Sequence, residues 1–446
     1  MYYALPAYPE DAMWKLVSLL VLLSFPALAT TYYVSPTGRD TNAGTSTTAP
    51  FLTIQHAAQL THPGDIVDVM TGSYGPLNIP HSGTAAAWIT YQAYPGQHPV
   101  VNKTDAVANG IQLGTSNRPV SYITIQGFTI VGNAGKYTLA QAMAQTPGGA
   151  DWRFNGSCID AYPADHHIKI IGNDVSLCPG TGILAPGDYI WIYGNNVHNN
   201  AYWSPTARSG ITIKGTNSDT SPAAKIFVFD NAVHDNQQYV CSGLVTTPTC
   251  WITDGQGIIV DTNNSTLTKD PTVTFNPAAG YSGRVEIYNN VSYHNGGRGI
   301  IAHRSQHVDI YNNTTFWNDL TPDQQASGGE IVVTHCDDVR VENNIEYGNP
   351  VAAMSYPIIY AGTNVVFDYN VLFNGLAIAP IGPHDLVGDP SFDPVGPYNF
   401  HLLAGSIAVW TGEGTLVPAA DFDGYNRASL GPPTRGAFAK YINPAM

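Results

Sequence analysis

A short pattern of apolar residues and asparagine recurs along most of this 446-residue chain. In each copy, an aliphatic residue, any residue and a second aliphatic or aromatic residue precede an asparagine. The clearest copies are VEIYNN, which begins at Val285, and VDIYNN, which begins at Val308. Apolar and polar residues alternate in both, as in a strand that buries one face. The spacing of 23 residues is typical of one coil of a β-solenoid, a fold built from stacked turns of chain.

Two such series of residues can be aligned along the chain. The first series begins at Ile123, Ile168, Ile190, Ile226, Val285, Val308, Val339 and Val365, and its aligned asparagines are Asn173, Asn195, Asn231, Asn290, Asn313, Asn344 and Asn370. The second series marks another strand by a small residue, or Glu330, before an isoleucine at 111, 159, 183, 211, 258, 300 and 331. Stacked coils place equivalent residues about 4.8 Å apart, so we expect the asparagines to form a ladder of side-chain amides.

The composition agrees with an all-β chain, because 44 Gly and 32 Pro disfavour helices and charged residues make up only 11%. We therefore predict one right-handed parallel β-helix over residues 30–387. Helical spacing in residues 51–60 predicts an N-terminal helical cap over the first coil. Residues 388–446 lack the repeat, and we expect them to form an irregular C-terminal cap that covers the open sheet edges.

Residues 1–29 have the features of a targeting segment. Lys15, the apolar run 16–25 and the small residues around Ala29 match a secretory signal, and residues 1–12 are interpreted as an upstream extension. The apolar run is shorter than the roughly 20 residues of a spanning helix, so no stable membrane anchor is expected. The sequence predicts a secreted protein, extracellular or periplasmic, that is a monomer.

Five cysteines in an exported chain are compatible with disulfides. Cys241 and Cys250 bracket a short loop and form the first candidate pair, and Cys158 with Cys178 forms the second. Cys336 would then be left over. The sequence alone leaves these pairings open.

The net charge of −15, with only 18 Lys and Arg residues, argues against a nucleic-acid partner. An acidic protein can hold an acidic sugar chain only through a local basic patch or a bridging cation. An acidic polysaccharide partner therefore requires such a patch or cation site in the sequence.

Strand alternation places the first and third residues after each isoleucine of the second series on the outer face. The third position brings Lys214, Asp261 and His303 about 5 Å apart on successive coils. The catalytic candidates are Lys214, Asp261, His303, Arg298 and Glu330, the last two lying beside this column after glycines. The substrate-binding candidates are Asp160, Tyr202, Trp203, Trp251, Arg304 and His335. The aromatic residues belong to insertions, where they stack on sugar rings or pack their own loops.

A calcium site is a further expectation. Asp254, Asp261 and Asn263 supply hard oxygen donors of the kind that Ca²⁺ accepts, and neighbouring glycines would let backbone carbonyls approach. Their spacing is not that of an EF-hand. Ordinary loop carboxylates are the alternative interpretation.

These residues carry a resemblance to a known group of proteins. The opening YYVSPTGRD from Tyr32, the asparagine-marked coils and the segment DGQGIIVD that ends at Asp261 resemble the pectate-lyase-like right-handed β-helix superfamily. The resemblance covers nearly the whole mature chain. It implies a polysaccharide lyase that acts on uronate chains by β-elimination, in which Lys214 would remove the proton and Ca²⁺ or a cationic side chain would neutralise the carboxylate.

Two other functions remain open at this point. Asp254, Asp261 and Glu330, or Asp160, could instead supply the acid and base of a glycoside hydrolase. The third possibility is a non-catalytic, carbohydrate-binding or adhesive solenoid, since this fold serves several functions. The cluster of ionisable residues favours an enzyme.

Overall fold

The computed structural model describes residues 29–144, 151–242, 251–270, 272–323, 328–350, 358–360, 362–374 and 382–442. Of the predicted signal segment, residues 1–28 lie outside these ranges. None of the helices in these ranges is long and apolar enough to cross a membrane.

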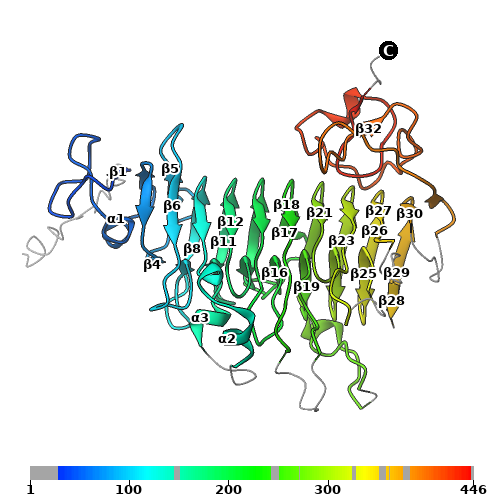
Figure 1. Ribbon diagram of the computed structural model, residues 1–446, viewed down its shortest axis with the longest axis horizontal. Coiled ribbons are helices and arrows are strands. Elements are labelled where there is room, and N and C mark those ends of the chain that lie inside the picture. The colour runs from blue at the N-terminus through cyan, green and yellow to red at the C-terminus, as the bar shows by residue number, and fades with distance from the viewer. Residues whose placement is uncertain are drawn as a thin grey trace, which may run out of the picture.

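Three parallel sheets, called A, B and C, run along the molecule, and each full coil contributes one strand to each sheet (Figure 1). Sheet A contains β1 (Thr31–Val34), β2 (Ile66–Val69), β5 (Ile89–Ala93), β8 (Ser121–Gln126), β11 (His166–Ile171), β14 (Asp188–Tyr193), β17 (Ala224–Phe229), β20 (Arg284–Tyr288), β23 (Gln306–Tyr311), β26 (Asp337–Glu342) and β29 (Thr363–Asp368). Sheet B contains β3 (Gly72–Tyr74), β6 (Pro99–Asn102), β9 (Thr129–Val131), β12 (Asp174–Ser176), β15 (Asn196–His198), β18 (Ala232–His234), β21 (Val291–Tyr293), β24 (Thr314–Phe316), β27 (Ile345–Tyr347), β30 (Val371–Phe373) and β31 (Leu386–Val387). Sheet C contains β4 (Leu77–Ile79), β7 (Ile111–Leu113), β10 (Ile159–Asp160), β13 (Ile183–Ala185), β16 (Ile211–Ile213), β19 (Ile258–Asp261), β22 (Ile300–His303), β25 (Ile331–Thr334) and β28 (Ile358–Tyr360). The predicted parallel β-helix is confirmed.

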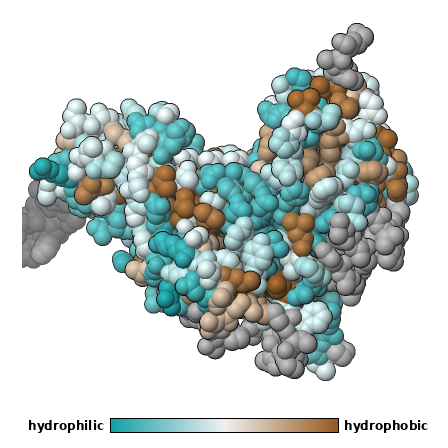
Figure 2. All heavy atoms as spheres, in the orientation of Figure 1, coloured by the Kyte–Doolittle hydropathy of each residue, from teal (hydrophilic) through white to brown (hydrophobic). Residues whose placement is uncertain are grey.

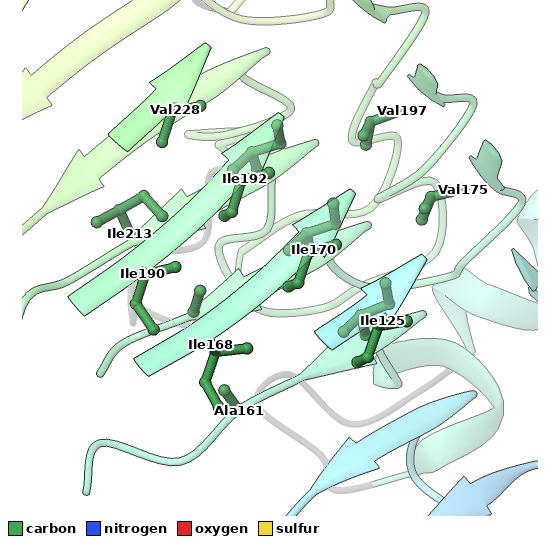
Figure 3. Close-up of a cluster of buried hydrophobic side chains, with 14 of the residues drawn as sticks. Ile125, Ala161, Ile168, Ile170, Val175, Ile190, Ile192, Val197, Ile213 and Val228 are labelled. Carbon is green, nitrogen blue, oxygen red and sulfur yellow. The ribbon is translucent and has the colours of Figure 1, made fainter. Parts of the chain in front are cut away.

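The core is a set of aliphatic columns inside the coils. Ile168, Ile190 and Ile226 stand in register on neighbouring strands of sheet A, and all three are fully buried. Figure 3 shows such side chains from several sheets pointing toward one another in the interior. Burial of each aliphatic side chain contributes about 1.5–3 kcal/mol, so the stacked columns are the main source of stability.

The expected asparagine ladder lies at the turn between sheets A and B. The Nδ2 of Asn195 donates to Oδ1 of Asn231 at 2.9 Å, and Asn231 donates in the same way to Asn290 at 2.9 Å. The same bond joins every neighbouring pair from Asn173 to Asn370. The ladder satisfies buried amides that would otherwise cost about 1–3 kcal/mol each.

A second ladder, which we did not predict, lies at the turn after sheet B. It runs through Asn200, Asn236, Asn295 and Asn318, with amide bonds of 2.9–3.0 Å. Its last member donates to the carboxyl of Glu330. Two ladders therefore fix the register of the coils at two of the three corners.

The N-terminal end is covered as predicted. The helix α1 (Ile54–Leu60) is shorter than the expected 51–60, because Thr53 caps it by accepting a hydrogen bond from the backbone of His56. Its buried residues Ile54, Ala57 and Ala58 belong to the main core. Two further helices, α2 (Leu139–Met143) and α3 (Trp152–Asn155), and the 3₁₀ turn η1 (Ala134–Lys136) occupy the insertion between β9 and β10.

The C-terminal segment differs from the prediction. Residues 388–442, which contain η3 (Arg427–Ser429), β32 (Leu402–Leu403) and β33 (Tyr441–Ile442), form a lobe that packs against the side of the later coils (Figure 1). The Nδ2 groups of Asn289, Asn312 and Asn343 donate to carbonyls of the lobe at 2.7–3.0 Å. Several earlier coils have glycine at this turn position and so offer no side-chain amide. The outward-facing amides of the three asparagines therefore form the surface on which the lobe packs. A hollow separates the lobe from the first coils (Figure 2).

The structure tests part of the predicted disulfide pairing. Cys158 and Cys178, our second candidate pair, form a disulfide. Cys241 is also disulfide-bonded, whereas its expected partner Cys250 lies outside the described residues. Cys336 is free and buried, as the predicted pairings require.

Candidate active site

The predicted column of ionisable residues assembles at the carboxyl ends of the strands of sheet C. Asp261 and His303 are paired in register at the ends of β19 and β22. Lys214 follows β16 on the preceding coil, and its Nζ donates to Oδ2 of Asp261 at 3.0 Å. Nδ1 of His303 lies 3.1 Å from Oδ1 of Asp261. Strand alternation thus brings together three side chains that are far apart in the sequence.

Asp261 is held in its ionised form. Burial alone would raise the pKa of this carboxyl, but the hydrogen bond with His303 and the charge of Lys214 outweigh burial and hold the pKa well below its usual range. Thr262 also donates its hydroxyl to Oδ1 at 2.8 Å. Each oxygen of Asp261 therefore has a fixed orientation and a hydrogen-bond partner.

Asp254 has the opposite electrostatic environment. Burial raises its pKa to about 6, and the negative charge of Asp261 adds to this shift, while a hydrogen bond from Thr253 and the charge of Arg298 oppose it. The Thr253 hydroxyl donates to Oδ2 at 2.9 Å, and Ser209 lies 3.4 Å from Oδ1. The two carboxyls, seven residues apart in the chain, are electrostatically coupled and have pKa values pushed in opposite directions.

Residues of opposite charge extend this cluster along the outer face of sheet C, the surface that we call the groove from here on. Burial raises the pKa of Asp160 to about 6, and the positive charge of Arg208 opposes that shift. Burial also lowers the pKa of Arg208, while Asp160 and Asp254 act to raise it. Arg298 similarly opposes the burial that raises the pKa of Asp319 to about 7. Acidic and basic groups therefore alternate from Asp160 to Asp319.

Arg208 and Asp319 were not among the residues predicted from the sequence. Arg208 stands three residues before the first isoleucine of β16, much as Arg298 stands two before that of β22. A charged residue just before a sheet C strand was therefore the available signal for Arg208. Asp319 follows an asparagine of the second ladder, which we had not recognised, so no comparable pattern marked it.

Glu330 does not belong to the groove. Its side chain is buried, and its two oxygens accept hydrogen bonds from the backbone and the side chain of Asn318 at 3.0 and 2.6 Å. Burial raises the pKa of this carboxyl to about 8. Glu330 terminates the second asparagine ladder, so its position does not support a catalytic role.

Two of the predicted substrate-binding residues hold loops of the fold in place. Trp203 donates its indole N–H to the carbonyl of Ala134 and packs on α2 and α3, so it supports the insertion. Arg304 donates to the carbonyls of Leu267 and Ser265 and holds the loop after β19.

The remaining predicted contacts differ in how accessible they are. His335 is buried next to Thr334, with 2.8 Å between its Nδ1 and the hydroxyl. Tyr202 is half-buried with its hydroxyl bound by Asn199, whereas Trp251 is 49% exposed. Of the aromatic candidates, Trp251 is the most accessible to a ligand.

The residues proposed for calcium do not fit that ion. Asn263 is buried, and its amide exchanges hydrogen bonds with the backbone of Gln306. Asp261 already faces the side chains of Lys214 and His303. Across the described part of the chain, no three His, Cys, Asp or Glu side chains gather in an arrangement that could hold a metal. The donors expected for calcium are therefore engaged elsewhere.

Comparisons with known proteins identify which known fold the chain shares. No protein-family model matches the chain. A curated relative, the uncharacterized protein YwoF of Bacillus subtilis strain 168, is 38% identical over 78 residues, which are 17% of this chain and only 16% of that protein. The crystal structure of pectate lyase Pel9A is 14% identical, covers 92% of this chain and 96% of its own, and has a TM-score of 0.50. The chain has a pectate-lyase-like parallel β-helix fold.

Other solved structures are more distant. The complex of XylC with xylose is 13% identical, covers 93% of this chain and 99% of its own, and has a TM-score of 0.46. The GH136 lacto-N-biosidase from Eubacterium ramulus is 14% identical, covers 77% of this chain and 56% of its own, and has a TM-score of 0.43. Identities of this size do not transfer an activity, since one fold serves many reactions.

Proposed function

We propose that this chain is a secreted glycoside hydrolase that cleaves a polysaccharide in the groove of sheet C. The observation that carries the proposal is the cluster of hydrogen-bonded ionisable side chains around Asp261, beside which Asp254 lies, together with the opposite directions in which the pKa values of these two carboxyls are displaced. Two neighbouring carboxyls with separated pKa values can divide the roles of acid and base between them. Glycoside hydrolysis needs such a pair on either side of the scissile bond.

Asp254 is the proposed general acid. With a pKa near 6 it keeps its proton in mildly acidic solution and can give it to the glycosidic oxygen as the bond to the anomeric carbon breaks. Asp261 is the ionised partner, which either attacks the anomeric carbon or takes a proton from the attacking water. Lys214 and His303 keep Asp261 charged and oriented during this step.

The proposed substrate carries carboxylate groups. Lys214 and His303 are 45% and 37% exposed at the groove. The chain as a whole is acidic, so this local group of cationic and titratable side chains is the patch that an acidic sugar chain requires. We propose a uronate-containing polysaccharide, and Trp251 offers a ring face for one of its sugar units.

β-Elimination remains the second candidate, favoured by Lys214, whose side chain is 45% exposed within the cluster. A lysine base has to approach the substrate proton through a free Nζ. The Nζ of Lys214 instead donates a hydrogen bond to Oδ2 of Asp261 at 3.0 Å. For this reason we rank hydrolysis first.

The test uses the full chain with a panel of uronate and neutral polysaccharides. Release of reducing ends and ultraviolet absorbance of unsaturated uronates would be followed together. We expect reducing ends without absorbance, and a loss of at least 100-fold in Asp254→Asn and in Asp261→Asn. The control Asp174→Asn removes a carboxylate that pairs with His198 on sheet B, and it should keep full activity.

Two outcomes would contradict this assignment. Rising absorbance that disappears in Lys214→Ala would establish elimination. Full activity in both aspartate variants would place the chemistry elsewhere.

A further inference from the structure

A pocket lies between sheet A and the C-terminal lobe. Its volume is about 330 Å³. The lining residues are Phe229, Asp230, Tyr288, Asn289, Tyr311, Pro418, Ala419 and Ala420. Because it lies at the corner between sheets A and B, it is across the coil from the groove on sheet C.

Three aromatic rings form one wall of this pocket. The rings of Phe229 and Tyr288 stack with centroids 4.9 Å apart, and those of Tyr288 and Tyr311 stack at 5.1 Å. The hydroxyl of Tyr311 donates to Glu286 at 2.8 Å, which fixes the end of the stack. The wall is rigid and apolar, as is usual in small-molecule sites.

Asp230 adds a polar group to the apolar wall. Oδ1 of its carboxyl is buried and has no hydrogen-bond partner within the described residues. Burial raises the pKa of Asp230 to about 6, although Asn289 and Arg427 act against this shift. A buried oxygen without a partner costs about 1–3 kcal/mol, and a ligand hydroxyl could supply the missing donor.

The charge around the pocket disfavours an anion. Arg427, the cationic residue beside it, is buried and donates through Nη2 to Asn289, Gly436 and Ala437 at 2.8–2.9 Å. Asp230 and the buried Asp421 are both acidic neighbours. A neutral molecule rich in hydroxyl groups matches this environment better than a carboxylate does.

We infer that this pocket binds one neutral sugar residue of a polysaccharide, at a site separate from the groove. The volume lies at the lower end of the roughly 300–1,000 Å³ of ligand pockets, which suits a single ring rather than a chain segment. Because the stacked rings cover one another's faces, their edges line the pocket and pack against the carbon–hydrogen surface of the sugar, and Asp230 accepts from a hydroxyl. Such a site anchors the protein to a glycan independently of cleavage.

The test measures binding by calorimetry in the full chain carrying Asp261→Asn, so that cleavage does not interfere. The probes are neutral oligosaccharides of glucose, xylose, mannose and galactose, with oligogalacturonate for comparison. Asp230→Gly removes the carboxyl without backbone strain, because Asp230 has φ 54° and earlier coils hold Gly172 and Gly194 at this turn with φ 59° and 65°. Ala419→Trp fills the pocket, and Ala428→Trp is its control, since Ala428 lines only a neighbouring cavity of the lobe.

We expect at least one neutral oligosaccharide to bind, with a Kd at least tenfold weaker in Asp230→Gly and in Ala419→Trp and unchanged in Ala428→Trp. Three results would overturn the inference: no binding of any neutral probe, equal affinity in all variants, or stronger binding of oligogalacturonate that depends on Asp230. Equal affinity in all variants would place the ligand in the groove or elsewhere.

Discussion

Glu346 offers a sharp test of the energetics of the β-helix core. Its side chain is fully buried at the centre of β27, and its carboxyl oxygens meet no side-chain donor among the described residues, although the backbone N–H of Ile331 approaches them and acts to lower the pKa. Its neighbours in register are Thr315 and Leu372. Burial raises the pKa of Glu346 well above 4.5, and the negative charges of Asp385 and Glu330 add to the shift. We predict that Glu346→Leu, which extends the neighbouring Leu372 column, stabilises the protein.

The magnitude depends on pH. Burial favours the protonated form of the folded carboxyl, whereas the unfolded carboxyl is ionised above its ordinary pKa of 4.5, and each pH unit between the two pKa values costs about 1.4 kcal/mol. The oxygens, which lack a side-chain donor, add about 1–3 kcal/mol at any pH. Because the folded state binds more protons than the unfolded state in this interval, stability of the wild type falls as pH rises.

Urea denaturation of the wild type and Glu346→Leu at pH 4.5 and 7 measures this difference. We expect a gain in the free energy of unfolding of about 1–3 kcal/mol at pH 4.5, and a larger gain at pH 7, where ionisation of the unfolded wild-type carboxyl adds to the difference. The control Glu413→Gln removes a partly exposed carboxylate of the lobe and should change stability by less than about 0.5 kcal/mol. A loss of stability in Glu346→Leu at both pH values, or a gain that does not depend on pH, would refute the reasoning.

Three further predictions follow from the groove and the ladder. We expect the alkaline limb of the pH profile of kcat/KM near pH 6, where Asp254 loses its proton. Arg298→Gln should move this limb to higher pH, because the positive charge of Arg298 lowers the pKa of Asp254. An unmoved limb would show that Arg298 does not act on the acid of the reaction. A chelator should change neither activity nor Tm, since the expected calcium donors are engaged by other residues, and a clear loss would show that a metal is needed. Asn231→Ala should lower the free energy of unfolding by about 2–4 kcal/mol, because it breaks the amide ladder in its middle, and an unchanged urea midpoint would argue against the ladder's contribution.

The parts of the structure that repeat could be predicted from the sequence. The recurring asparagines predicted the first ladder, because an asparagine that returns at the same position of successive coils can stack its amide on the next. The alternation of residues after each isoleucine placed Asp261 beside His303, because side chains of a strand point to opposite faces in turn.

The parts that do not repeat were harder to predict. Glu330 replaces the small residue before an isoleucine, which suggested a groove position, but its side chain turns inward onto Asn318. The lobe packs on the side of the coils through Asn289 and similar turn residues, a contact that no period in residues 388–446 could indicate. Asp230 became a candidate only when the lobe closed a pocket over it.

The most direct test of the proposed hydrolysis is mass spectrometry of the products formed in isotopically labelled water. The account predicts that one heavy oxygen from water enters each new reducing end, and that the fragments sum to the mass of the substrate plus water for each cut. Unsaturated fragments whose masses sum to that of the substrate, without heavy oxygen, would contradict it and would identify elimination instead.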